Sequence, residues 1–157
     1  MKVCIIGLDG ATEEILDIMN IKSKGVFSKL LSTIPPYTPP AWTSILSGVN
    51  PGTHGVYGFY RVRDGRVVIN TSWSVRYPRL FEMLSINKLK SVVINVPLTY
   101  PFSGLMFREN YVVVSDWASP VQAVWPSNLD EKYKEYLVEP PHTWCKHSQG
   151  DFGYIRI

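Results

Sequence analysis

Three short apolar runs without polar alternation stand out along the chain: Val3–Leu8, Ser91–Val96 and Tyr111–Ser115. All are rich in β-branched residues, and each stops at a turn or polar residue. Such runs are typical of strands that are buried on both faces of a sheet. Because segments with helical patterns separate them, we expect the three runs to be neighbouring parallel strands.

Helical spacing of apolar residues and capping signals predict helices between and around these strands. Asp64-Gly65 between two β-branched runs predicts a hairpin over residues 56–71. The pattern as a whole predicts an α/β protein, a three-layer α/β/α fold with a mostly parallel sheet, in one domain over residues 1–157. The predicted helices cover residues 12–20, 26–31, 39–46, 78–86 and 129–137, and a last strand is predicted over 152–157.

Composition narrows the class of protein. The 157 residues are 45% hydrophobic and carry a net charge of only +3, with scattered Lys and Arg. This excludes a disordered chain and gives no basic stripe for nucleic acid. No apolar stretch approaches the roughly 18 residues of a membrane span. Cys4 and Cys145 form no metal or disulfide spacing, and Cys4 is expected to be a buried thiol. We therefore expect a cytoplasmic protein without nucleic-acid or membrane partners.

Asp9 is the first candidate for chemistry, because it ends the first predicted strand beside Gly10. Ligands in open α/β sheets bind beyond the carboxyl ends of strands, and a carboxylate there suits a hard metal ion. The alternative is that Asp9 only caps the following turn.

Thr38 is the second candidate. It lies between Pro35-Pro36 and Pro39-Pro40, directly before a predicted helix whose free N–H groups would face an anion. Its hydroxyl could attack phosphorus if a metal lowered its pKa, since no neighbouring base is evident. The alternative is that Thr38 is only a helix cap.

Three segments together carry a family resemblance: residues 6–12 (IGLDGAT), 35–56 (PPYTPPAWTSILSGVNPGTHGV) and 93–101 (VINVPLTYP). They resemble the alkaline phosphatase superfamily in its type I phosphodiesterase / nucleotide pyrophosphatase branch, and look closest to its predicted phosphohydrolase or phosphomutase members. The resemblance covers the N-terminal part of that fold.

The resemblance implies a metal-dependent phosphohydrolase or phosphodiesterase. Asp9 matches a ligand to one of two divalent metals, expected to be zinc with manganese as the alternative. Thr38 matches the residue that binds the same metal and attacks phosphorus, giving a phosphothreonine that water later hydrolyses. The substrate would be a phosphate ester. His54 is expected to be a structural hydrogen-bonder rather than a ligand.

Two features depart from the family pattern. An Asn that follows the His-Gly pair in nucleotide pyrophosphatases is absent from residues 56–59, and Asn95 is either its replacement or a residue that holds the Pro97 turn. The distal Asp and His ligands of the family also have no match here. His142, His147 and Asp151 supply donor atoms in no zinc-type spacing, so a surface loop is the alternative there.

The chain is therefore expected to be an incomplete phosphohydrolase. The rival interpretation is a non-catalytic fragment or subunit that acts by binding a partner chain, which would carry the distal half. A nucleotide-binding module is disfavoured, because residues 7–10 (GLDG) are not the dinucleotide fingerprint and no phosphate-cradling Gly-Lys-Ser/Thr occurs.

Overall fold

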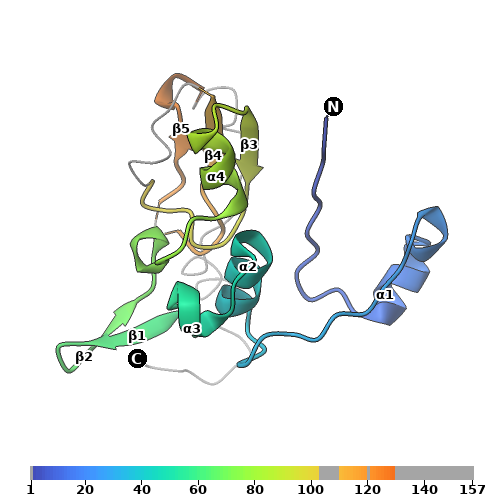
Figure 1. The fold of residues 1–157 in the computed structure, drawn as a ribbon, viewed down its shortest axis with the longest axis horizontal. Coiled ribbons are helices and arrows are strands. Elements are labelled where there is room, and N and C mark those ends of the chain that lie inside the picture. Colours follow the sequence, from blue (N-terminus) through green and yellow to red (C-terminus); the bar gives the residue numbers. More distant parts are fainter. Residues whose placement is uncertain (1, 103–109, 120, 130–157) are drawn as a thin grey trace, which may run out of the picture. The chain divides into compact units, whose positions relative to one another are not determined.

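The computed structural model describes residues 2–102, 110–119 and 121–129. The chain divides into two compact units, Met1–Ser32 and Thr33–Ile157, which are described separately below. Figure 1 shows the elements of each. The predicted helix over 129–137, the predicted strand over 152–157, and His142, His147 and Asp151 lie outside the described residues, apart from Leu129. No helix of the described part of the chain is long and apolar enough to cross a membrane.

The first unit contains a short helix, α1 (Glu13–Ile18), and a 3₁₀ turn, η1 (Lys22–Lys24). The two acidic residues at the start of α1 stabilise the helix, because their negative charge interacts favourably with the positive end of the helix dipole. Lys22 bridges Glu13 at 2.9 Å and Asp17 at 2.8 Å, and Lys29 bridges Glu13 at 2.5 Å. The hydrogen bonds from Lys29 and Lys22 lower the pKa of Glu13 to about 2. These contacts tie η1 and the following segment to α1.

Two predictions for this unit are wrong. Residues 3–8 are extended but belong to no β-ladder among the described residues, and Cys4 is exposed rather than buried. A strand exists only through hydrogen bonds to a partner strand, which an apolar run does not supply by itself. Residues 26–31 are not helical, and Val26 and Leu31 are fully exposed. Residues 26–31 contain no acidic residue to stabilise a first turn, as Glu13 and Glu14 do in α1, so a helix this short does not offset its nucleation cost there.

The second unit holds the other elements in chain order. It begins with two helices and a hairpin, continues with a helix and two parallel strands, and ends with a short antiparallel strand (Figure 1). The elements are α2 (Thr38–Ser47), α3 (Pro51–His54), β1 (Tyr60–Arg63), β2 (Arg66–Ile69), η2 (Ser72–Ser74), α4 (Leu80–Ile86), β3 (Ser91–Ile94), β4 (Tyr111–Val114), β5 (Val124–Trp125) and η4 (Ser127–Leu129).

The larger sheet has the order β3-β4-β5. Strands β3 and β4 are parallel neighbours, with Val93 opposite Val113, as predicted. The short β5 pairs antiparallel with β4, and β1 pairs antiparallel with β2. Two of the three pairings in the described residues are thus antiparallel. The α/β class is confirmed, but a mostly parallel sheet and a three-layer arrangement are not.

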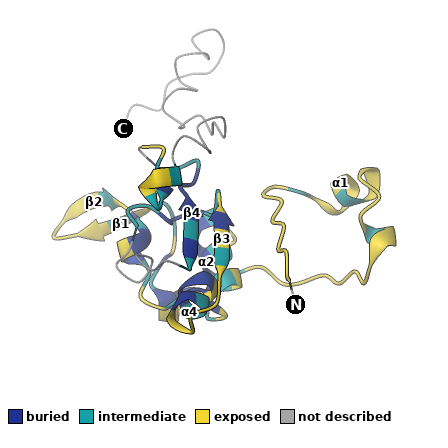
Figure 2. Ribbon diagram, turned by 90° about the horizontal axis from the view of Figure 1, so that it is seen from above, coloured by how far each residue is buried: buried dark blue, intermediate teal, exposed yellow. Residues whose placement is uncertain are grey.

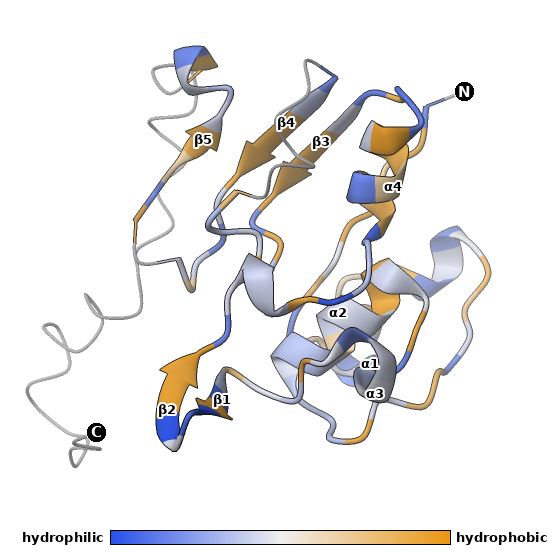
Figure 3. Cartoon of the chain, turned by 60° about the vertical axis from the view of Figure 1, so that its left-hand side comes forward, coloured by the Kyte–Doolittle hydropathy of each residue, from blue (hydrophilic) through white to orange (hydrophobic). Residues whose placement is uncertain are grey.

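One face of the β3-β4 pair forms the core. Phe81 of α4 packs there against Val93, Tyr111 and Val113, with Leu46 of α2 at the margin. On the other face Val92 and Ile94 are exposed among the described residues, so β3 is not buried on both faces as expected. Figure 2 shows β4 as the most buried strand, and Figure 3 shows that β3 and β4 are both hydrophobic along their length. The apolar run predicted the strand, but its burial depends on what other segments cover it.

The predicted hairpin is confirmed, with shorter strands than expected. Arg63 pairs with Arg66 across the two-residue turn Asp64-Gly65. Both turn residues have positive φ, 50° at Asp64 and 72° at Gly65, as the favoured hairpin turns require. The strands are mostly exposed, which Figure 2 shows as a yellow arm.

Candidate functional site

Thr38 is the first residue of α2. The N-cap of this helix is Tyr37, whose side chain makes no capping hydrogen bond. Thr38 therefore does not cap the helix, contrary to the alternative interpretation. The helix ends at Gly48, which has φ 72° and donates its N–H to the Ser44 carbonyl at 2.9 Å. Thr38 is half-buried. The helix holds its backbone, and part of its surface is accessible to solvent.

The prolines after Thr38 change the expected chemistry of this helix end. Pro39 and Pro40 are buried and have no N–H, and the N–H of Ala41 already donates to the Tyr37 carbonyl at 3.0 Å. Within the first turn, the backbone N–H of Thr38 is the one donor that makes no helical hydrogen bond. The expectation of several free N–H groups is wrong, and Thr38 alone offers an anion both an N–H and a hydroxyl.

His54 fastens α3 to α2. Its Nε2 lies 2.9 Å from Ser44 Oγ, and its Nδ1 accepts the backbone N–H of Val56 at 3.2 Å. Because Nδ1 accepts, the neutral ring carries its proton on Nε2, the nitrogen that faces Ser44 Oγ. The ring is fully buried, and burial lowers its pKa, opposed by a hydrogen bond to the Pro40 carbonyl. His54 is thus a neutral structural hydrogen-bonder, as expected, in a position that braces the first turn of α2.

A row of aromatic rings leads from the α2 start towards the sheet. Tyr37 meets Phe59 edge to face at 5.4 Å between ring centroids, and Phe59 meets Trp117 in the same way at 5.8 Å. Phe59 lies in the stretch where the family's Asn is missing, so an apolar ring occupies this part of the site. Trp117 follows β4, so the row connects the residue before Thr38 with the carboxyl end of a strand.

Asn95 follows β3 at the same edge of the sheet. It has φ 56°, and its Oδ1 accepts a hydrogen bond from the backbone N–H of Trp117 at 2.9 Å. This bond joins the loops that follow β3 and β4, so Asn95 does more than hold the Pro97 turn. Its carbonyl end is committed to this bond, and only its NH₂ end is suited to face an anion.

Asp116 lies at the carboxyl end of β4, where the sequence alone marks it only as the residue that follows the predicted strand Tyr111–Ser115. Its Oδ2 accepts the backbone N–H and the Oγ1 of Thr99, each at 3.2 Å, and its Oδ1 accepts the Ala118 N–H at 2.9 Å. Burial raises the pKa of Asp116, while the hydrogen bonds from Thr99 and Ala118 lower it. The side chain is 5% exposed and ties the two loops together.

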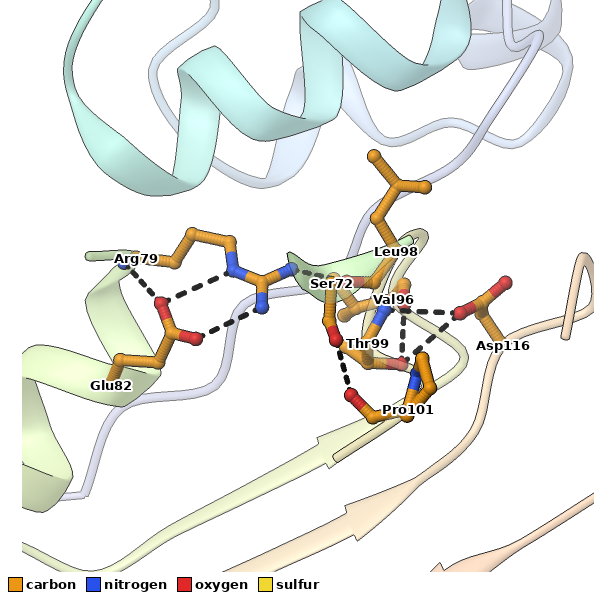
Figure 4. A network of polar contacts seen from close by, with 8 residues as sticks. All are labelled: Ser72, Arg79, Glu82, Val96, Leu98, Thr99, Pro101 and Asp116. Atoms are coloured by element: carbon orange, nitrogen blue, oxygen red, sulfur yellow. Dashed lines mark hydrogen bonds and ion pairs between the residues drawn. The ribbon is translucent and has the colours of Figure 1, made fainter. Parts of the chain in front are cut away.

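A buried ion pair supports the same loop from α4 (Figure 4). The Arg79 guanidinium pairs with both carboxylate oxygens of Glu82, at 3.0 and 3.3 Å, and donates to the Leu98 carbonyl at 2.7 Å. Ser72 donates to the Pro101 carbonyl in the same network. The sequence predicted a helix over Arg79 and Glu82 but carried no signal that either is buried, because the Leu98 carbonyl that accepts from Arg79 is 19 residues away along the chain.

Asp9 is exposed in the first unit, in a turn closed by the Ala11 N–H and the Leu8 carbonyl at 3.4 Å. Gly10 has φ 71°, which fits the turn. The observed turn is compatible with both interpretations of Asp9.

A sequence model of the type I phosphodiesterase / nucleotide pyrophosphatase family matches residues 3–149. The chain belongs to this family. No curated protein and no solved structure matches it. Both Asp9 and Thr38 fall within the matched region, as do the loops after β3 and β4. The resemblance seen in residues 6–12, 35–56 and 93–101 is thereby confirmed, and membership places the chain among phosphoester hydrolases.

Family membership implies divalent metal ions in the complete enzyme. An Asp9 carboxylate and a Thr38 hydroxyl are oxygen donors of the right kind for such an ion. They are too few, since catalytic zinc sites generally use about three protein ligands. The described residues contain no cluster of three or more His, Cys, Asp or Glu that could hold a metal. The two donors are thus of a kind that suits a divalent ion, but fewer than such a site needs.

Proposed function

We propose that this chain is the N-terminal portion of a metal-dependent phosphohydrolase or phosphodiesterase in which Thr38 is the nucleophile. The observation that carries the proposal is the place of Thr38 in a family-matched segment, as the first residue of α2 with a hydroxyl that does not cap the helix. We further propose that Asp9 and Thr38 bind the same metal ion. The remaining sheet of the complete fold would complete a three-layer, mostly parallel arrangement.

The chemistry assigned to Thr38 is attack of Oγ on phosphorus. The Oγ–P bond forms as the P–O bond to the leaving alcohol breaks, and the hydroxyl proton passes to solvent. Water then attacks phosphorus, which restores the Thr38 hydroxyl and releases phosphate or a phosphate monoester. When bound, the divalent ions lower the pKa of the attacking hydroxyl and offset charge on the leaving oxygen.

The residues around Thr38 supply positioning. His54 and Ser44 brace α2, and Pro39 and Pro40 restrict its first turn, so the hydroxyl is held with little conformational freedom. The Thr38 N–H is the backbone donor nearest to an attacked phosphoryl group. In the proposal, Asn95 adds an amide donor in place of the Asn absent from residues 56–59.

The test is release of nitrophenol from p-nitrophenyl phosphate and bis(p-nitrophenyl) phosphate with zinc or manganese supplied. We expect the 157-residue chain alone to turn over poorly, because Asp9 and Thr38 are too few ligands. Joined to a chain with the distal family ligands, it should become active. Thr38→Ala and Asp9→Asn should then abolish turnover, and the matched controls Thr53→Ala and Asp64→Asn, both at exposed positions, should not.

Mass spectrometry of the quenched reaction should find a phosphoryl group on the peptide that contains Thr38. Full activity of Thr38→Ala contradicts the nucleophile assignment. Robust turnover by the chain alone, lost on mutation of His142 or His147, shows that those histidines form a site of their own. If the chain binds a separate chain that carries the distal family ligands but the complex does not release nitrophenol, the alternative of a non-catalytic subunit is favoured.

A further inference from the structure

One face of the β1-β2 hairpin is apolar and exposed. The side chains of directly paired residues lie on the same face of a sheet, and the face alternates from one pair to the next. Tyr60 pairs with Ile69, and Val62 pairs with Val67, so these four side chains share one face, the apolar hairpin face. They are 53%, 54%, 74% and 70% exposed, in that order. Four adjacent apolar side chains with this exposure form a patch, which is typical of a docking surface.

The opposite face of the hairpin is cationic. There Arg61 pairs with Val68, and Arg63 pairs with Arg66. Arg63 and Arg66 are exposed, and like charges directly opposite each other destabilise a hairpin. Arg63 has a solvent-exposed ion pair with Asp64 at 3.7 Å, and Arg66 has no ion pair in the part of the chain that the structure describes. The two arginines are therefore suited to bind an external anion.

The opposed faces decide between the possible partners. A folded protein that covers the apolar hairpin face lies on the side away from Arg63 and Arg66, so its acidic groups reach them poorly. A second copy would add only the same four side chains, whereas stable interfaces use about 20–30 residues on each side. A lipid interface meets both faces at once, because apolar side chains enter the acyl boundary while long arginine side chains extend to the headgroups. Tyr60 adds an aromatic ring of the kind that is enriched at this boundary.

We propose that the β1-β2 hairpin docks the chain on an anionic lipid surface. The hairpin lies in the plane of the interface, with Val62 and Val67 in the acyl boundary and with Arg63 and Arg66 on the anionic headgroups. This binding goes beyond the proposed hydrolysis, since it requires neither a metal nor Thr38. It differs from the expectation of no membrane partner, which rested on the lack of a long apolar stretch. A hairpin that lies at the surface of a bilayer needs no such stretch.

The first experiment is co-sedimentation of the 157-residue chain with vesicles of phosphatidylcholine alone or of phosphatidylcholine and phosphatidylserine in equal parts. We expect binding to the mixed vesicles, and high salt should weaken it because salt screens the arginines. Arg63→Gln with Arg66→Gln should weaken binding roughly tenfold or more, since each basic residue near an anionic surface adds several-fold to the affinity. Lys88→Gln with Lys90→Gln removes the same charge from exposed positions outside the hairpin and should have a much smaller effect.

A second pair of variants tests the apolar hairpin face. Val62→Thr with Val67→Thr keeps β-branched side chains in both strands and should weaken binding roughly fivefold or more. Val3→Thr with Val92→Thr is the matched control, because Val3 and Val92 are similarly exposed, at 72% and 61%, outside the hairpin. The control should leave binding unchanged. An unshifted Asn70 backbone amide resonance, from the N–H that donates to the Phe59 carbonyl, confirms that the hairpin of each variant is folded.

The proposal is overturned by any of several results. The chain would fail to sediment with the mixed vesicles, would bind phosphatidylcholine alone equally well, or would lose no more binding in the hairpin variants than in their controls. Disruption of a dimer by Val62→Thr with Val67→Thr, measured by analytical ultracentrifugation, would assign the apolar hairpin face to a second copy. Loss of sedimentation when the chain is joined to one that carries the distal family ligands would assign this face to the interior of the complete fold.

Discussion

Thr99 and Asp116 meet at a single oxygen: Asp116 Oδ2 accepts the backbone N–H of Thr99 at 3.2 Å and shares the Thr99 hydroxyl proton, also at 3.2 Å, with the Val96 carbonyl at 3.0 Å. They stand on the loops that follow the two parallel strands, 17 residues apart in sequence. The pair fixes the separation of these loops, both of which line a pocket together with Phe59 and Tyr60. Two adjacent parallel strands thus end in a single rigid edge.

The first prediction concerns this pair. Asp116→Asn replaces one acceptor oxygen by an NH₂ group, which cannot accept from Thr99 or from Ala118. Thr99→Val removes only the hydroxyl. We expect each change to lower the free energy of unfolding by about 1–3 kcal/mol, with a coupling of about 0.5–3 kcal/mol between them. Urea denaturation of the single and double variants measures the coupling, and additive losses would show that the two side chains act independently.

The second prediction concerns the pH dependence that His54 creates. Burial lowers its pKa below the value of about 6.5 in an unfolded chain, so the unfolded state binds more protons. Its stabilising effect is therefore complete above about pH 6.5 and is lost as the pH falls through that value towards the folded pKa, by at most about 1.4 kcal/mol per pH unit.

The difference in unfolding free energy between the wild type and His54→Gln isolates this effect. It should be larger at pH 8 than at pH 5. Ser44→Ala serves as a control, because it removes one hydrogen bond but retains the titrating ring. A wild-type advantage that is the same at both pH values would contradict a neutral, buried His54.

The third prediction concerns the buried pair of Arg79 and Glu82, which are 1% and 6% exposed. Glu82→Gln leaves the guanidinium buried without a counter-charge and should cost about 3–5 kcal/mol. The double change Arg79→Met with Glu82→Leu removes both charges and should cost less than Glu82→Gln alone. Thermal unfolding measures which variant loses more stability. As a control, Asp17→Asn, which breaks an exposed ion pair, should lower the unfolding temperature little.

The fourth prediction compares two glycines, each of which has open space where a Cβ would lie. Gly65 has φ 72°, so Gly65→Ala forces a left-handed residue into the hairpin turn and should cost about 1–2 kcal/mol. Gly25 has φ −176°, an extended conformation that alanine adopts readily. The backbone amide of Asn70 donates to the Phe59 carbonyl beside the hairpin strands. Its hydrogen exchange should accelerate in Gly65→Ala and stay unchanged in Gly25→Ala.

Two outcomes would contradict this prediction about the glycines. Unchanged exchange in Gly65→Ala would mean that the turn adapts without strain. Faster exchange in both variants would point to a general effect of the added methyl group rather than to the backbone angle.

The sequence by itself determined the features that depend on neighbours along the chain. Asp64-Gly65 specified a hairpin turn because both positions need positive φ, and Gly48 ended α2 for the same reason. The apolar runs at 91–96 and 111–115 specified two adjacent parallel strands, and the segments 6–12, 35–56 and 93–101 together indicated the family.

Only the tertiary structure decided the features that depend on partners far apart in sequence. The run at 3–8 has the composition of a strand, yet strand formation requires a hydrogen-bonded partner that composition does not provide. Asp116 joins two loops because Thr99 lies opposite it, and the buried Arg79 guanidinium has a hydrogen-bond partner in the distant Leu98 carbonyl. Local patterns fix backbone angles and the faces of elements, whereas the burial of a polar group depends on long-range contacts that give it hydrogen-bond partners.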